Sequence, residues 1–381
     1  MSLLLGGDLV WWRWANRALR TRFARVALGS FILIQLGYML TILLGAFVPR
    51  HDSNLFVVWG FCLAYAWHLL VLPATLIVFG ISWLWRKWSE SSNLGQNDHL
   101  SGEPRVSRRD VLRTAMIAMP PLVAVGGMAL GASELFRFRV RSIVVPLRSL
   151  PRALDGMTIA HVSDPHIGRF TNDYLLDAIV ERANALNADL TLFAGDLIDV
   201  ALADLPVAIR FAKRLRARYG VYFCQGNHDL IEDRSHKTNI FETETLAAGL
   251  NMLFDDAATI RVRDVPVQIL GVRWYASNPT RIQHTNEVMA LRDSTAFGIC
   301  LAHHPHVWDN STTPLTIAGH THGGQLMLNE RLGVGPVMFR YWSGLYTRGD
   351  QALVVSNGTG NWFPIRTMAP AEIIHITLKC V

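Results

Sequence analysis

Two long runs of uncharged, mostly apolar residues constrain the N-terminal third of this 381-residue chain more than any other feature. Residues 26–48 form the first run and residues 55–85 the second. Both exceed the about 20 residues that a helix needs to cross about 30 Å of hydrocarbon, and such lengths disfavour the alternative of two buried core helices. Because only residues 49–54 separate the runs, we expect a hairpin of two membrane-spanning helices.

A third uncharged run, at residues 114–133, is weaker because it contains Pro120–Pro121 and Gly126–Gly127. The segment before it reads Ser107-Arg108-Arg109-Asp110-Val111-Leu112, which resembles the twin-arginine export signal with Val where Phe is usual. The other interpretation is the basic flank of an ordinary third span. Both interpretations place the arginine pair on the same side of the membrane.

Basic residues flank these runs unevenly. Five arginines precede the first run and six Lys or Arg residues lie between the second and third, whereas the hairpin loop offers only Arg50. Basic flanks remain in the cytoplasm, so we expect the N-terminus and a flexible loop at residues 86–113 to be cytoplasmic. If the third run crosses, the rest of the chain is extracytoplasmic, which is our expectation; otherwise it is cytoplasmic. We divide the chain into a membrane anchor of two to three helices (1–135) and a second domain (136–381).

The charge distribution argues against a nucleic-acid partner. Residues 1–113 hold 12 Lys/Arg and 6 Asp/Glu and carry the whole formal charge of +6, while residues 114–381 hold 24 of each. A nucleic-acid-binding domain needs clustered positive charge on its folded surface. The four cysteines have no metal-binding or redox spacing, so we expect buried thiols, which leave the compartment open.

Beyond residue 136, short β-rich runs alternate with amphipathic helical segments. We expect strands at 157–162, 190–194 and 221–224, with helices at 173–187 and 206–218 between them. Later segments favour strands, at 265–272, 298–302, 315–318, 352–356 and 372–378. Strand–helix alternation followed by strand runs predicts a layered α/β domain around stacked sheets.

Polar side chains follow five of these strands directly. In α/β sheets, loops at the carboxyl ends of strands gather into sites. Seven oxygen and nitrogen donors without a thiolate favour Mn, Fe, Zn or Co, and they suit two ions that share one carboxylate. Two such ions can clamp a phosphoryl group. The candidate ligands are Asp164, His166, Asp196, Asn227, His303, His320 and His322.

Together these motifs resemble the calcineurin-like metallophosphoesterase superfamily. The likeness covers roughly residues 150–380. It rests on Asp164-x-His166, Gly195-Asp196-x-x-Asp199, Gly226-Asn227-His228-Asp229, His303-x-Pro305 and Gly319-His320-x-His322-Gly323-Gly324-Gln325. The Gly-Gly-Gln extension is similar to the membrane-linked bacterial branch with phosphodiesterase members, as are Ser343-Gly344-Leu345-Tyr346, Asn357-Gly358 and Pro364-Ile365-Arg366.

The resemblance implies a four-layer α/β/β/α sandwich behind N-terminal transmembrane helices, and it assigns roles to the site residues. Two divalent ions, Mn, Fe or Zn, would be held by Asp164, His166 and His322 and by Asn227, His303 and His320, with Asp196 bridging. A hydroxide between the ions would be the nucleophile. His228 would contact the phosphate or protonate the leaving oxygen, and Asp199 and Asp229 would orient ligating groups.

The resemblance also implies an enzyme of the bacterial inner membrane, and the charge asymmetry places its catalytic domain outside the cytoplasm. It would hydrolyse phosphodiester or pyrophosphate bonds in substrates that could be lipid-linked. One alternative is a UDP-2,3-diacylglucosamine-type lipid pyrophosphatase, although that cytoplasmic substrate conflicts with the expected topology. Another is a non-catalytic scaffold, which the complete ligand set disfavours.

Several positions stay open from sequence. His304 neighbours His303, and the His-x-Pro pattern favours His303 as the ligand. His306 stands where relatives often carry Asp and receives no role. For Arg169 and Arg366 we weigh contact with the substrate phosphate against a surface salt bridge.

Overall fold

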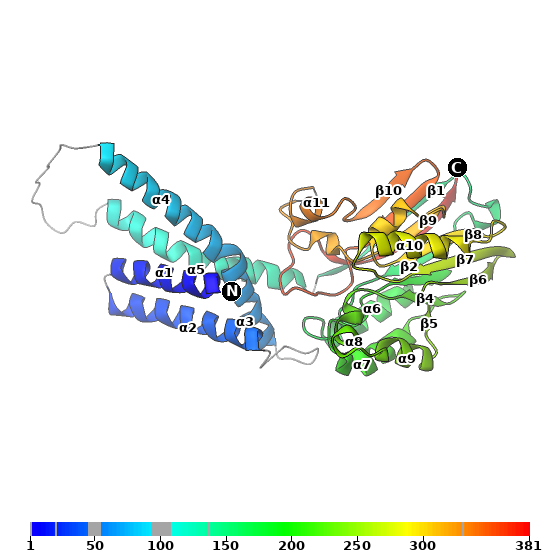
Figure 1. The fold of residues 1–381 in the computed structure, drawn as a ribbon, viewed down its shortest axis with the longest axis horizontal. Coiled ribbons are helices and arrows are strands. Elements are labelled where there is room, and N and C mark those ends of the chain that lie inside the picture. Colours follow the sequence, from blue (N-terminus) through cyan, green and yellow to red (C-terminus); the bar gives the residue numbers. More distant parts are fainter. Residues whose placement is uncertain (1, 20, 45–54, 93–107, 136, 330) are drawn as a thin grey trace, which may run out of the picture. The chain divides into compact units, whose positions relative to one another are not determined.

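The computed structural model describes residues 2–19, 21–44, 55–92, 108–135, 137–329 and 331–381 (Figure 1). The expected hairpin loop at 49–54, and residues 93–107 of the expected flexible loop, lie outside the described residues. The chain divides into two compact units, one ending at Ala132 and one running from Ser133 to Val381.

The N-terminal unit is helical. It contains α1 (Ser2–Ala18), α2 (Arg22–Leu44), α3 (Leu55–Tyr65), a π-helical turn η1 (Ala66–Val71), α4 (Leu72–Ser92) and most of α5 (Arg108–Leu135). Three segments are long and apolar enough to cross a membrane, at Arg22–Thr41, Phe56–Trp85 and Ala115–Leu135. These coincide with the three runs expected from sequence. Helix α1 was not expected.

Helix α1 is joined to the π-helical turn through buried polar groups. Asp8 on α1 is 1% exposed; its Oδ1 accepts a hydrogen bond from Trp67 Nε1 at 2.8 Å, and its Oδ2 lies 2.9 Å from His68 Nε2. The apolar side of α1 buries Trp11 and Ala15 in the same unit. Burial of a paired carboxylate explains how a helix with an acidic residue joins an apolar bundle.

The second unit is built on two six-stranded sheets. The first has the order β1 (Phe138–Leu147), β12 (Ala371–Cys380), β2 (Thr158–Val162), β3 (Leu190–Ala194), β4 (Val221–Cys224), β5 (Asn251–Met252). The second has the order β10 (Gly344–Arg348), β11 (Gln351–Val355), β9 (Leu315–Ala318), β8 (Phe297–Ala302), β7 (Val265–Val272), β6 (Asp256–Val262). Strands β2, β3 and β4 pair in parallel, as do β7, β8, β9 and β11.

The alternation of side chains along each strand sets the layers. On β3, Leu192 and Ala194 pack in the core between the sheets, whereas Phe193 packs against α6 (Asp173–Ala185) and α7 (Leu205–Arg214). On β8, Leu301 faces the same central core, and Cys300 packs against α10 (Asn278–Ala290). Helices therefore cover both outer faces, as Figure 1 shows, and the expected α/β/β/α sandwich is confirmed.

The remaining helices are α8 (Ile231–His236), α9 (Ile240–Ala247) and α11 (Val334–Met338). Strands β3, β4, β7 and β9 begin and end as the sequence predicted. The sequence did not predict strand β1, because this strand is half exposed at the edge of its sheet and carries arginines on its solvent-exposed side. The expected helix at 206–218 ends at Arg214, because Leu215 adopts an extended conformation.

Candidate metal centre

The loops after β2, β3, β4, β8 and β9 bring all seven expected ligands into one cluster. Parallel strands carry their carboxyl ends to the same edge of a sheet, and the two sheets face each other there. Each of these side chains approaches at least one other, through the contacts described next. His304 lies beside the cluster, with its ring stacked on that of His320 at 4.9 Å between centroids.

The first ligand group consists of Asp164, His166 and His322, whose donor atoms lie within 4.8 Å of one another. The Nε2 atoms of the two histidines are 2.9 Å apart, and His322 Nε2 is 3.6 Å from Asp164 Oδ1. All three side chains are buried. This group could hold one ion.

The second group consists of Asp196, His303 and His320, again within 4.8 Å. His303 Nε2 lies 3.2 Å from Asp196 Oδ2, 3.0 Å from His320 Nδ1 and 2.9 Å from Asn227 Oδ1. The other ring nitrogen, His303 Nδ1, is 2.8 Å from the Ala194 carbonyl oxygen, which orients the ring. This group could hold a second ion.

Asp196 lies between the two groups. Its Oδ2 is 3.5 Å from His166 Nε2 in the first group and 3.2 Å from His303 Nε2 in the second. His166, Asp196 and His228 also form a group of potential ligands by proximity, so distance alone does not separate His228 from the ligand set. A carboxylate in this position can reach two ions at once.

Five of the seven side chains stand on backbone in the left-handed region, which L-residues rarely adopt. The φ angles are 52° at Asp164, 46° at His166, 55° at Asp196, 75° at His320 and 51° at His322. Such conformations cost free energy and persist where the surrounding structure enforces them, chiefly at functional sites. Here they turn successive side chains of one short loop toward the same point.

Glycines make room for these ligands. A Cβ at Gly226 would collide with the Asp196 carboxylate, and one at Gly319 would collide with the carboxylate of Asp164. Backbone therefore approaches both carboxylates more closely than any other residue type allows.

Two further carboxylates support the cluster. Asp229 accepts backbone hydrogen bonds from Gly226 (2.8 Å), Asp196 (3.1 Å) and Ile198 (3.0 Å), and so fixes the β3 and β4 loops. Burial would raise the pKa of Asp199, but hydrogen bonds with His166, His228 and Arg169 hold it well below its usual range. Arg169 thus pairs with Asp199 beside the site, and its side chain is 28% exposed.

The imidazole of His228 lies beside His166 and Asp196. Its Nδ1 lies 2.5 Å from the Asp199 carbonyl oxygen, which can only accept, so Nδ1 donates. Burial lowers the pKa of the imidazole, but the carboxylates of Asp196 and Asp199 outweigh it and raise the pKa to about 9. The backbone N–H of His228 donates to Asp196 Oδ1 at 2.8 Å.

The structure fits neither of the two roles that the sequence suggested for Arg366, which were contact with the substrate phosphate and a surface salt bridge. It is fully buried, and its guanidinium donates to Asn361 Oδ1 and to the carbonyl oxygens of Asn357, Gly360 and Ala369. Its Nη2 also lies 3.3 Å from His322 Nδ1. Arg366 is therefore a structural residue of the loop after β11, because burial and these contacts keep it from solvent.

The loop after β11 also belongs to the site, although the sequence motifs assigned it no role. The backbone N–H groups of Thr359 and Gly360 donate to the carbonyl oxygens of Ser163 and Asp164, at 2.8 and 3.0 Å. These two hydrogen bonds thus attach the segment that carries Asp164 to the loop that follows β11 of the second sheet. Its sequence signal was the Asn357-Gly358 pair, which marks a turn without indicating a partner.

The chemistry of the donor set fits divalent ions. Imidazole nitrogens, carboxylates and one amide oxygen converge without a thiolate, a combination that suits Mn, Fe or Zn. Burial and His303 lower the pKa of His320 to about 3, which keeps this imidazole in the neutral form that binds metals. Burial opposes the charged form of His303, yet the Asp196 carboxylate raises its pKa to about 9.

A cavity of about 420 Å³ opens beside the cluster. Its polar lining includes His166, Asp196, Asn227, His228, His320 and His322. Its apolar lining, which we name the apolar wall, consists of Leu326, Val334, Met338, Phe339, Trp362 and Phe363. The apolar wall was not expected, because its residues follow no metal-ligand or strand-end pattern.

An α/β/β/α sandwich with carboxylate and imidazole donors at its strand ends is the arrangement that the resemblance to the calcineurin-like superfamily implied. The sequence model of the family described as "Calcineurin-like phosphoesterase" matches residues 157–334. Residues 157–334 thus form a calcineurin-like phosphoesterase domain, as the motifs predicted.

Curated relatives are similar over the same region. An "Uncharacterized metallophosphoesterase" of Campylobacter jejuni is 30% identical over 63% of this chain and 63% of its own length. A "Transmembrane protein with metallophosphoesterase domain" of Danio rerio is 30% identical over 63% of this chain and 57% of its own. "UDP-2,3-diacylglucosamine pyrophosphatase LpxG" of Chlamydia trachomatis is 24% identical over 58% of this chain and 83% of its own. The chain thus spans less than two thirds of the first two relatives.

Proposed function

We propose that this protein is a membrane-anchored phosphohydrolase that uses two divalent ions to cleave phosphodiester or pyrophosphate bonds. The observation that carries the proposal is the position of Asp196, whose Oδ2 lies within 3.5 Å of ligand nitrogens in both groups. A shared carboxylate between two donor sets is what a pair of ions about 3.5–4 Å apart requires.

The ligand assignment follows the two groups. Asp164, His166 and His322 would hold one ion, and Asn227, His303 and His320 would hold the other, with Asp196 shared. When bound, the ions would polarise the phosphoryl oxygens and activate water for in-line attack. Mn, Fe and Zn all fit these donors.

We assign proton donation and the positioning of the ligands to residues that neighbour the two groups. His228 lines the cavity, and Asp199 fixes its Nδ1, so its Nε2 is the group that would donate a proton to the phosphate or to the leaving oxygen. Asp199 and Asp229 would position His228 and Asp196 rather than touch the substrate.

The test is hydrolysis of bis(p-nitrophenyl) phosphate by the purified full-length chain with added Mn²⁺. Asp196→Ala should lower kcat/KM by at least about a thousandfold, because it removes the group shared by both ions. Elemental analysis should show wild-type protein with close to two ions per chain, and the variant with one or fewer.

A surface carboxylate on the same domain provides the control. Asp177 on α6 pairs only with Arg214, and both side chains are more than half exposed, so Asp177→Ala should leave turnover unchanged. Equal turnover by Asp196→Ala and Asp177→Ala would reject the shared-carboxylate assignment.

A second candidate is cleavage of the pyrophosphate in a nucleotide-linked glycolipid. The similarity to the Chlamydia trachomatis pyrophosphatase favours it, and so does the apolar wall beside the metal groups, which could accept acyl chains. The purified chain assayed on UDP-2,3-diacylglucosamine should release UMP if this candidate is correct. Turnover of the aryl diester without that release would restrict the proposal to phosphodiesters.

A further inference from the structure

Six large apolar side chains are exposed on the segments that contribute Leu326, Met338 and Trp362 to the cavity lining. Leu328, Leu332, Val337, Met338, Trp362 and Met368 are between 43% and 81% exposed, and we name them the apolar rim. A single exposed leucine is ordinary, whereas a group of such side chains on neighbouring segments is typical of an interaction surface. Met338 and Trp362 also line the cavity, so the rim is continuous with the site.

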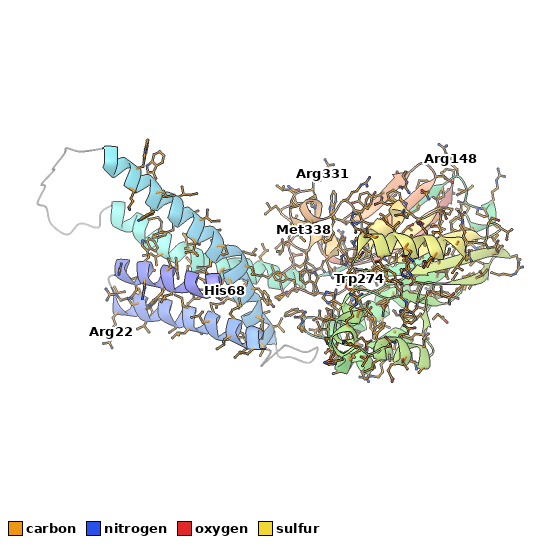
Figure 2. All side chains as sticks on the ribbon, viewed as in Figure 1. Arg22, His68, Arg148, Trp274, Arg331 and Met338 are labelled. Atoms are coloured by element: carbon orange, nitrogen blue, oxygen red, sulfur yellow. The ribbon has the colours of Figure 1, made fainter. Side chains whose placement is uncertain are left out.

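Backbone hydrogen bonds order the segment that carries Leu328 and Leu332 of the rim. The Leu328 N–H donates to the Leu332 carbonyl oxygen at 2.8 Å, and Asn329 Oδ1 accepts from the amides of Arg331 and Leu332 at 2.9 Å each, which closes a tight turn. Bridges from Met327 to Gly333 and from Leu326 to Thr367 fasten this turn to the segment that carries Met368. Arg331 and Met338 lie at the same end of the domain, near α11 (Figure 2). Exposure of these side chains is therefore built into the fold.

Arginines adjoin the apolar rim. Arg139, Arg141 and Arg331 line a cavity of about 290 Å³ that also includes Met368 of the rim. The buried Glu372 pairs with Arg139 and Arg141, at 2.7 and 3.6 Å, so it balances only part of their charge. Residues 114–381 carry no net charge, which makes this a local concentration of cations; Glu330 lies outside the described residues.

We propose that the apolar rim and its arginines contact the surface of an anionic phospholipid leaflet, and that the metal centre takes a lipid phosphoester from that leaflet. Exposed apolar side chains flanked by arginines match the acyl boundary and the anionic headgroups of such a surface. The proposed membrane contact does not depend on the proposed function, whereas the proposed lipid substrate does.

The tether supports a membrane rather than a protein as the partner. Strand β1 begins three residues after α5 ends, and α5 contains a candidate membrane span. At no more than about 3.6 Å per residue, this connection holds the first strand within about 11 Å of the end of α5. A domain so close to a bilayer gains contact with it at little entropic cost.

The contact is tested by fluorescence quenching in the full chain, reconstituted in nanodiscs of phosphatidylcholine with phosphatidylglycerol. Cys380 is the one cysteine that is not buried, so Val337→Cys is labelled with an environment-sensitive fluorophore in a Cys380→Ser background. Leu246→Cys on α9 is the control, since Leu246 is 48% exposed and Figure 1 shows α9 and α11 at opposite ends of the domain. Nitroxide on the lipid acyl chains should quench the label at 337 and spare the label at 246.

The substrate is tested with Leu328→Ser/Val337→Ser. These two side chains are the most exposed of the rim, and neither lines the cavities of about 420 and 290 Å³ described above, so the fold and the turnover of bis(p-nitrophenyl) phosphate should be unchanged. Turnover of a glycolipid pyrophosphate or phosphatidyl diester in the nanodisc should fall at least about tenfold, because two apolar anchors are lost.

The outcomes separate the two proposals. If the label at 337 responds to aqueous iodide like the label at 246 and not to lipid nitroxide, the rim does not contact lipid; capture of a second copy or of a soluble protein there would also overturn the inference. An equal loss of turnover on soluble and lipid substrates would reject the lipid role of the rim. If wild-type protein hydrolyses neither substrate while the label at 337 is quenched by lipid, the proposed function fails and the membrane contact stands.

Discussion

At the scale of single residues, the site depends on side chains that hold other side chains in place. Asp229 is the strongest case, because its carboxylate accepts from three backbone N–H groups, one of which belongs to Asp196. Burial and the Asp196 carboxylate raise the pKa of Asp229 to about 7, which shows how closely the two acidic groups are packed. Neither group can be moved without disturbing the other.

We expect Asp229→Ala to loosen the β3 and β4 loops. Three buried N–H groups would lose their acceptor, at about 1–3 kcal/mol each, so the local stability should fall by about 3 kcal/mol or more. Hydrogen exchange resolved to the Asp196, Ile198 and Gly226 amides should accelerate by about two orders of magnitude or more. Asp229→Asn keeps one oxygen acceptor and should give an intermediate effect; unchanged exchange of these amides in the alanine variant would contradict the role.

Residue scale is also where sequence reasoning was least reliable. The motifs identified every member of the two ligand groups, since ligands lie at fixed short spacings after strands. They could not place Arg366, because its five contacts come from residues 322, 357, 360, 361 and 369, and only folding brings these together. The ligand roles themselves remain predictions, as does the role of His228.

At the scale of elements, the N-terminal unit shows that hydropathy alone undercounts helices. The three apolar runs were evident, but α1 was not, because it carries Asp8 and two arginines. Its attachment depends on a buried carboxylate opposite Trp67 and His68, at a π-helical turn of the kind that is frequent at functional sites. The partners lie about 60 residues away in sequence, so no local pattern reveals them.

We expect Asp8→Ala to destabilise the helical unit by about 3 kcal/mol or more, because it leaves Trp67 Nε1 and His68 Nε2 buried without their acceptor. Resistance of the full chain in mild detergent to unfolding by added SDS would measure this loss. Asp8→Asn retains an oxygen for Trp67 and should be less severe. The pairing would be contradicted if the alanine variant resisted SDS as well as wild type.

At the scale of the whole molecule, the chain combines a helical unit containing candidate membrane spans with a phosphoesterase domain. Charge asymmetry predicts that the domain lies outside the cytoplasm, since an odd number of crossings separates it from the basic loop at 86–113. That prediction matters for the substrate, because it separates an extracytoplasmic phosphoester from a cytoplasmic nucleotide-linked lipid.

Labelling of intact cells with a membrane-impermeant maleimide tests the orientation. Leu246→Cys on the domain should be labelled from outside, and Ser101→Cys in the expected cytoplasmic loop should be labelled only after permeabilisation. Both variants carry Cys380→Ser, and the Cys380→Ser chain, whose Cys62, Cys224 and Cys300 are buried, supplies the background. The reverse labelling pattern would place the domain in the cytoplasm and favour the lipid pyrophosphatase candidate.

The sequence by itself determined the candidate spans, a layered α/β domain and the members of the ligand cluster. These features depend on local periodicity, on run length and on which residue types follow a strand. Only the tertiary structure decided that Arg366 is buried and that an apolar rim lies beside the metal ligands. Those features depend on distances between segments far apart in the chain, which strand pairing and loop packing set and no local pattern records.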